Sequence, residues 1–365
     1  PATLTFTPAG WDTAQTVTLT GENDAAMDGN QIVTITTSLD STADTAFQSL
    51  TSTPVTVTNS DDDSPGITVS PTSGLTTTEA GDTATFSVAL NSAPAADVSF
   101  DITSGNTNEI TVSPGSLTFT NLNWSTPQTV TLTGIEDDID DGDILATVTN
   151  SAATSADGNY NGRVVSDVTV TNSDNDVAGI TVTPTSGLTT SEAATTATFT
   201  VVLGTQPTAD VTIPISSGDT TEVSVSPASV TFTTVNWDTA QTVTLTGVDD
   251  AGVSDGDQLV MITLGAATSA DLKYDTLNPT DVMVTNTDGD AVGFTVTPTS
   301  GLITSESGAT ATYSVVLTAQ PSATVSFNIG SGDLSEVSVS PASISFTTLN
   351  WGTPQTVTLT GVEDS

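Results

Sequence analysis

The sequence predicts an all-β protein built from tandem β-sandwich domains, and three observations lead to this fold class. First, Trp11, Trp124, Trp237 and Trp351 recur every 113 or 114 residues, each ahead of the same run, Gln-Thr-Val-Thr-Leu-Thr-Gly. Second, short segments alternate apolar and polar residues with the period of two that marks a half-buried strand. Third, Gly, Pro, Asn and Asp separate these segments, and no segment keeps a helical period. A domain repeated in tandem places the function in what every copy shares.

The composition excludes several classes of function. The 365 residues include 43 Asp and Glu against only Arg163 and Lys273, for a formal net charge of -41. A surface this acidic repels nucleic acid and anionic lipid, so we expect neither as a partner. The chain has no Cys and no His, which excludes disulfides and thiol chemistry and removes the usual zinc ligands and the commonest general base. No apolar run reaches the roughly 18 residues of a membrane span.

The register of the repeats divides the chain into four parts. Residues 1–65 form the C-terminal part of a first repeat, 66–178 and 179–292 are complete repeats, and 293–365 form the N-terminal part of a further repeat. Each complete repeat is large enough to bury its own core. The first and last parts both contain the tryptophan segment, whereas subunits that complete one another by donating strands would split the repeat cleanly. We therefore expect a window onto a longer array, arranged as beads on a string, rather than a polymerising subunit.

The repeat 66–178 shows the expected strands in order. They run over 67–78 with a break at Pro71 and Gly74, then over 84–90, 98–102, 110–119 with a bend at Pro114, 130–132, 144–148 and 164–170. These segments are rich in Thr and Val, which fit a pleated, half-buried surface. About seven short strands in this order predict a sandwich of immunoglobulin-like type.

Strand direction places the acidic residues of one repeat together. If successive strands alternate in direction, the end of the first strand, the loops after the third and fifth, and the end of the seventh lie at one pole. These positions carry Glu79, Glu109, the loop 136–143, and Asp174 with Asp176. We therefore expect an acidic pole on each sandwich, where the next repeat begins.

The same acids recur in the other copies. Glu192 and Glu306 match Glu79; Glu222 and Glu336 match Glu109; Asp24, Asp250 and Asp364 match Asp137; Asp28 and Asp255 match Asp141; Asp61, Asp63, Asp288 and Asp290 match the linker pair. Like charges at 4 Å repel by about 1 kcal/mol per pair even in water. Calcium suits such a site because it accepts 6 to 8 oxygen ligands in irregular geometry. Magnesium needs a tighter octahedron, and transition metals would recruit His or Cys. The simpler interpretation is that acidic turns keep a Thr-rich surface soluble, but recurrence at fixed positions favours calcium.

These residues carry a resemblance to a known family. The segment Thr78-Glu-Ala-Gly-Asp-Thr-Ala-Thr-Phe86, the Gly-x-x-Asp loop at Gly134 and the terminal Asp174-Asn-Asp176 resemble the Calx-beta domain, and the linker acids resemble those of cadherin repeats. The run from Phe119 through Trp124 to Gly134 is similar to tandem modules of large bacterial adhesin-like proteins. The resemblance implies a calcium site at one end of each sandwich that stiffens the joint.

The resemblance also implies a set of calcium ligands. They are Glu79, Asp137, Asp141, Asp174 and Asp176, with Glu192, Asp250, Asp255, Asp288, Asp290, Asp24, Asp28, Asp61, Asp63, Glu306 and Asp364 at the matching positions. The first copy has Asn23, Ala25 and Met27 in place of acids, so its site is expected to hold fewer ions. The third copy has an extra residue before Asp255.

Three other interpretations stay open or are set aside. The recurring tryptophans could stack on sugars, which would make the chain a glycan-binding surface module, although a recurring Trp in a sandwich is more often a packing residue. Evenly spread acidity would instead suit a halophilic surface-layer-type protein, but the acids cluster at loops. Paired carboxylates also serve glycosidases, yet the acids lie beside domain joints with no substrate pocket signalled, so we expect no enzyme.

We therefore expect a structural or adhesive extracellular repeat protein. Calcium would stiffen it into a rod that serves as an adhesin stalk or extracellular filament, secreted or displayed on a cell surface, most plainly a bacterial one. Its expected partners are neighbouring repeats or other copies of the protein, and a cell-surface or glycan target.

Overall fold

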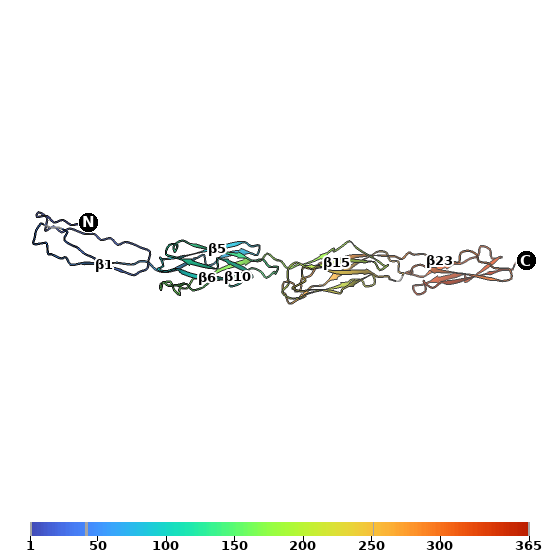
Figure 1. The fold of residues 1–365 in the computed structure, drawn as a ribbon. Helices are drawn as coiled ribbons and strands as arrows, with labels where there is room; N and C mark the ends of the chain where they lie inside the picture. The colour runs from blue at the N-terminus through green and yellow to red at the C-terminus, as the bar shows by residue number, and fades with distance from the viewer. Residues whose placement is uncertain (1, 41–42, 251, 364–365) are drawn as a thin grey trace. The chain divides into compact units, whose positions relative to one another are not determined.

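The computed structural model describes residues 2–40, 43–250 and 252–363, and every regular element in them is a β-strand (Figure 1). The chain separates into two compact units. The first comprises Pro1–Asp137 and Asp141–Asn175, and the second comprises Asp138–Asp140 and Asp176–Ser365. The fold class is thus all-β, as the sequence predicts. No helix in the described part of the chain is long and apolar enough to cross a membrane.

The first unit begins with a two-stranded sheet. Strands β1 (Gln31–Ile35) and β2 (Val55–Asn59) pair antiparallel. The segment 15–21 forms no strand there, contrary to the expectation from its repeat sequence. Strands pair through hydrogen bonds to neighbouring strands, and among the described residues no strand pairs with this segment.

A β-sandwich of two sheets fills the rest of the first unit. One sheet has the order β3-β5-β9-β7, and the other has the order β11-β6-β10-β12-β4, with β8 pairing β6. The strands are β3 (Ile67–Ser70), β4 (Leu75–Thr78), β5 (Thr83–Leu90), β6 (Val98–Ser104), β7 (Ile110–Ser113), β8 (Ser116–Phe119), β9 (Gln128–Gly134), β10 (Ile144–Asn150), β11 (Thr154–Ser155) and β12 (Val168–Ser173).

The seven expected strands are all present, but two of them divide between the sheets. The first becomes β3 and β4, and the bent fourth strand becomes β7 and β8. Each division falls at a proline, Pro71 or Pro114, because proline lacks the N–H that a ladder needs. The division places β4 beside the last strand, β12, which positions the acidic residues.

The two sheets enclose one apolar core. Phe86, Phe119 and Leu132 are among its largest fully buried side chains, and their strands show the expected alternation of buried and partly buried residues. Trp124 packs partly buried against this core. The alternation is the direct result of side chains pointing to opposite faces along a strand.

The second unit repeats the same plan. Its sheets have the orders β13-β15-β19-β17 and β14-β22-β20-β16-β18 with β21 on β16, followed by β23-β24-β28-β26 and the pair β25-β27. The strands are β13 (Ile180–Thr183), β14 (Leu188–Ser191), β15 (Thr196–Leu203), β16 (Val211–Ser217), β17 (Val223–Ser226), β18 (Ser229–Phe232), β19 (Gln241–Gly247), β20 (Gln258–Leu264), β21 (Thr268–Ser269), β22 (Val282–Thr287), β23 (Phe294–Thr297), β24 (Thr310–Leu317), β25 (Val325–Asn328), β26 (Val337–Ser340), β27 (Ser343–Phe346) and β28 (Gln355–Gly361).

Candidate metal centre

The candidate site lies where two parallel strands end together. Strand β4 pairs with β12 in parallel register, with Thr78 opposite Ser173. The next residue of each segment is acidic, Glu79 after β4 and Asp174 after β12. Parallel strands end at the same edge of a sheet, so these two carboxylates meet although 95 residues separate them in sequence.

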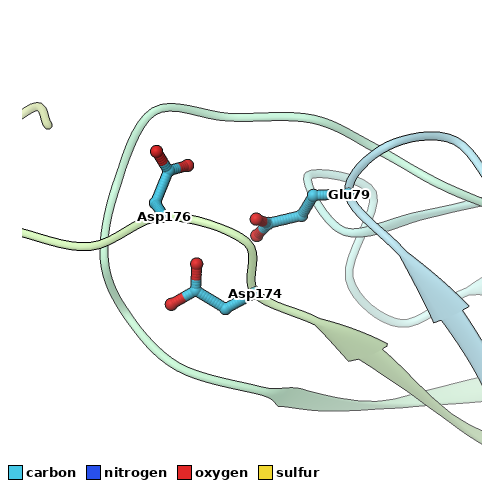
Figure 2. A group of neighbouring side chains, drawn as sticks. All are labelled: Glu79, Asp174 and Asp176. Atoms are coloured by element: carbon cyan, nitrogen blue, oxygen red, sulfur yellow. The ribbon is translucent and has the colours of Figure 1, made fainter.

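Glu79, Asp174 and Asp176 form a group of three carboxylates (Figure 2). One oxygen of each lies within 4.8 Å of the others. Glu79 is only 2% exposed and its carboxylate points toward the turn that carries the two aspartates (Figure 2). The Asn175 amide donates a hydrogen bond of 3.1 Å to Glu79 Oε2, which holds that turn against the glutamate.

A reciprocal pair of hydrogen bonds fixes Asp174. The Gly142 amide donates to Asp174 Oδ2 at 2.6 Å, and the Asp174 amide donates to Asp143 Oδ1 at 3.1 Å. Gly142 has a φ of +80°, a backbone conformation that glycine adopts without a Cβ clash. This pair ties the loop between β9 and β10 to the end of β12.

The same reciprocal pair recurs in two other copies. Gly256 donates to Asp288 and Gly29 donates to Asp61, at 2.8 and 2.6 Å. The return bonds run from the Asp288 amide to Asp257 and from the Asp61 amide to Asn30, at 3.2 and 2.9 Å. The loop glycine and the first linker aspartate are therefore one structural device, and this explains their recurrence in sequence.

A buried asparagine supports a second carboxylate at the same edge. Asn172 is 1% exposed; its Oδ1 accepts from Thr77 at 2.9 Å and its Nδ2 donates to Glu109 Oε2 at 3.1 Å. Asn286 makes the matching bond to Glu222 at 3.0 Å. Because a buried polar group needs partners, this asparagine holds the glutamate in one position.

The third repeat contains two overlapping groups. Glu192, Asp250 and Asp290 form one, and Glu222, Asp250 and Asp255 form the other, each with oxygens within 4.8 Å. Burial, and then the charges of nearby aspartates, raise the pKa of Asp250. Burial is also the main cause that raises the pKa of Glu192, partly offset by a hydrogen bond from the Gly289 amide. Ionisation of these two carboxylates therefore costs more than it does in water, and a nearby cation would offset that cost.

The incomplete copies show weaker versions of this arrangement. Asp24, Asp28, Asp61 and Asp63 line one hollow in the first unit. Burial and the neighbouring aspartates raise the pKa of Asp63. In the last part of the chain Glu306 is exposed and lines a shallow hollow with Glu336. The predicted ligand Asp364 lies outside the described residues.

The structure brings only some of the sequence-predicted ligands into these groups. Glu79, Asp174 and Asp176 meet, as do Glu192, Asp250, Asp255 and Asp290, whereas Asp137 and Asp141 lie in the adjacent loop, outside the three groups found among the described residues. Asp288 accepts backbone hydrogen bonds, chiefly from Asp290 and Gly256, which lower its pKa. Glu222 belongs to one of the groups, although the predicted ligand set does not include it. Its recurrence with Glu109 and Glu336 was the available signal.

Both basic residues have partners elsewhere in the chain. Lys273 pairs with Asp140, and this hydrogen bond is the main cause that lowers the pKa of the Asp140 carboxyl. The Arg163 Nε donates to the Asn159 carbonyl at 2.6 Å.

The recurring tryptophans pack on the sandwiches. Trp124, Trp237 and Trp351 lie partly buried against the three apolar cores. Their carbonyl oxygens accept from the amides of Leu90 and its counterparts, at 2.9 to 3.3 Å. Trp11 is 71% exposed. These contacts favour the packing role over a sugar-stacking face.

Comparison with known proteins gives structural neighbours only. No protein-family model matches the chain, and no curated protein matches it. Similar solved structures include calcium binding domain CBD12 of CALX1.1 (TM-score 0.30, 15% identity, 60% of this chain and 99% of that chain) and the apo-form Calx CBD1 domain (0.25, 19%, 32% and 100%). Domains 4 and 5 of the S-layer protein SbsC are also similar (0.24, 21%, 53% and 77%). Likeness at this level says nothing about which ligands this chain binds.

Proposed function

We propose that this chain is a calcium-binding structural repeat protein of the extracellular space or cell surface. One observation carries the proposal: Glu79, almost fully buried, meets Asp174 and Asp176 from the far end of the same repeat, so that three carboxylates share one small site. Taking a carboxylate out of water is costly unless a charge compensates it. A bound cation would supply that charge.

Calcium fits the donor set best. The groups offer several carboxylate oxygens, which are ligands that a hard cation with flexible coordination prefers. The oxygens come from loops rather than from a rigid octahedral cage, which disfavours magnesium. The described donors include no nitrogen or sulfur side chain of the kind that transition metals recruit, since the sequence has no His or Cys.

A cation bound there would restrain the linker between repeats. Asp174 and Asp176 lie between β12 and β13, and Asp288 and Asp290 lie between β22 and β23. A cation that holds these aspartates would restrict the backbone motion of the short segment between the two strands. The tandem domains would then behave as a stiff stalk or filament, for adhesion or as part of an extracellular layer.

The test is a calcium titration of the full chain by calorimetry, followed by small-angle scattering in chelator and in calcium. We expect saturable binding that magnesium and sodium do not reproduce. We also expect the scattering to show a longer persistence length, and so a stiffer chain, when calcium is bound. An equal response to sodium would instead indicate halophilic acidity. No response to any cation would contradict the proposal and direct the search to glycan binding.

Localisation needs its own measurement. Antibodies against the chain, used for immunogold labelling of intact producing cells, should mark the cell exterior. Labelling only after permeabilisation would contradict an extracellular role.

A further inference from the structure

In both units, a main-chain hydrogen bond links the acidic loop of one repeat to a turn in the next repeat. The turn is the equivalent one in each case. In the first unit the Ala93 amide donates to the Ala25 carbonyl at 2.7 Å. In the second unit the Gln206 amide donates to Asp138 and the Gln320 amide donates to Gly252, both at 2.6 Å. The three donors occupy one position, the third residue after the end of β5, β15 or β24, and are not all the same residue type. The contact therefore depends on the main chain.

Hydrogen bonds from Tyr160 and Asp157 of the same sandwich stabilise the turn that donates this bond. Tyr160 is 1% exposed, and its hydroxyl accepts from the Ser92 amide at 3.2 Å and donates to the Ser92 carbonyl at 2.7 Å. The carboxylate of Asp157 accepts from the Ala95 amide at 2.9 Å. These bonds set the turn's shape within its own sandwich, so little ordering remains to be done when the loop binds.

The same brace is present in the third repeat. Tyr274 takes the place of Tyr160. Its hydroxyl accepts from the Thr205 amide at 3.0 Å and donates to the Thr205 carbonyl at 2.7 Å. Asp271 accepts from the Thr208 amide at 2.8 Å. The donor amide at Gln206 therefore also belongs to a preformed surface.

A second contact comes from the loop that carries the tyrosine. In the first unit Asn159 Nδ2 donates to the Met27 carbonyl at 3.3 Å. In the second unit, Lys273, at the position of Asn159, pairs with the carboxylate of Asp140, at the position of Met27. Asp140 also accepts from the Ala178 amide at 2.9 Å. A neutral side chain, Asn159, thus contacts a neutral residue, Met27, and a cationic side chain, Lys273, contacts an acidic residue, Asp140.

The loop and the receiving sandwich also pack closely in the second unit. Gly252 has a φ of +92°, and a Cβ on it would overlap the ring of Trp351. The glycine therefore lets the loop backbone approach the tryptophan as well as the turn. This gives Trp351 a contact beyond its own core.

We propose that the turn at Ala93, Gln206 and Gln320, together with the loop at Asn159 and Lys273, is a docking surface for the acidic loop of the preceding repeat. The partner is another repeat of this same chain. None of these contacts includes a metal ion, so the docking does not require bound metal. The side chain at this position, neutral in Asn159 and cationic in Lys273, adds selectivity for one loop over another.

The first test is amide hydrogen exchange of the full chain in excess chelator, resolved by NMR. The Gln206 and Gln320 amides should exchange about tenfold slower than the same residues in an unstructured chain, the effect of one good hydrogen bond. Exchange at the unstructured rate, with the adjacent strands still protected, would overturn the docking. Since no metal is present, this outcome is independent of whether calcium binds.

The second test exploits the two natural pairings. Lys273→Asn alone and Asp140→Met alone should each speed exchange at Gln206 by about two- to fivefold, as expected for an exposed ion pair. The double variant recreates the pairing of Met27 with Asn159 and should recover part of the protection. Gln320 is the internal control and should not change. Equal exchange at Gln206 in all four chains would refute the selectivity.

A third comparison separates the main chain from the side chain. Gln206→Ala keeps the amide and places there the residue found at Ala93, so protection of its amide should persist. Replacing Asp138, Ile139 and Asp140 by glycines leaves the turn intact but loosens the loop, and should abolish protection at Gln206 only. Retained protection in the glycine variant would show that the loop is not the acceptor.

Discussion

Asp250 is the residue whose substitution best distinguishes a metal site from a merely acidic surface. It belongs to both carboxylate groups of the third repeat. Its Oδ1 accepts from the Val253 amide at 3.1 Å, and an asparagine oxygen would keep that bond. Asp250→Asn therefore removes the charge and leaves the loop geometry in place.

The expected effect changes sign with calcium. In chelator, removing one of several like charges should leave stability unchanged or raise it, since each pair at this separation repels by about 1 kcal/mol even in water. With calcium at about 100 times its dissociation constant, each bound ion stabilises the folded state by about 2.7 kcal/mol. For a domain of this size that corresponds to a rise in Tm of about 10 °C. Asp250→Asn should lose most of this gain.

The assay is differential scanning calorimetry of the full chain in chelator and in calcium. Asp210→Asn is the matched control, because Asp210 is an exposed acid of the same repeat that belongs to neither group. It makes the same change in charge and should keep the full calcium-dependent rise. Equal loss in both variants, or a loss of stability in chelator as large as that in calcium, would refute Asp250 as a ligand.

Three further predictions concern the scaffold and its titration. Gly134→Ala should destabilise the second repeat by about 3 kcal/mol in urea unfolding, because a Cβ there would overlap a carbonyl oxygen of β4, whereas Gly158→Ala meets open space and should change little. Asn172→Ala should cost about 3 kcal/mol in the same assay by leaving its buried partners unsatisfied; a loss below about 1 kcal/mol would contradict the bracing role. In chelator, carboxyl NMR should show Glu192 and Asp250 titrating above their ordinary pKa values, and calcium should lower both. Their contribution to stability in chelator is full below the unfolded-state pKa and is lost as the pH rises through the raised folded-state pKa, because the folded state holds these protons more tightly; titration at or below ordinary values would contradict this.

The fold was largely predictable because its signals are local. Alternation from Ala84 to Leu90, the break at Pro71 and the bend at Pro114 predicted strands and their limits. The sequence could not show that the broken strands divide between two sheets, since pairing partners are chosen by the whole sandwich. That division brings Thr78 beside Ser173 and creates the edge on which the carboxylates meet.

The site was predictable only in part. Alternating strand direction predicted that Glu79, Asp174 and Asp176 lie at one pole, but it did not distinguish carboxylates that face a common point from those that cap backbone amides. Asp288 illustrates the second kind, since both its oxygens accept backbone hydrogen bonds. The inclusion of Glu222 depends on the buried Asn286, which joins residues 64 apart in sequence.

The sequence by itself determined the repeat length, the strand pattern, the acidity of each pole and the scarcity of basic residues. Tertiary structure decided which segments become strands and which acids converge. The run Gln-Thr-Val-Thr-Leu-Thr-Gly is the clearest case: it forms β9, β19 and β28 but no strand at 15–21. Likewise 75–78 and 188–191 are strands paired with β12 and β22, whereas 302–305 forms no strand in the described part of the chain. Identical local preference gives different structure because a strand is stabilised by its neighbours' hydrogen bonds and by burial between sheets, and neither is contained in the segment itself.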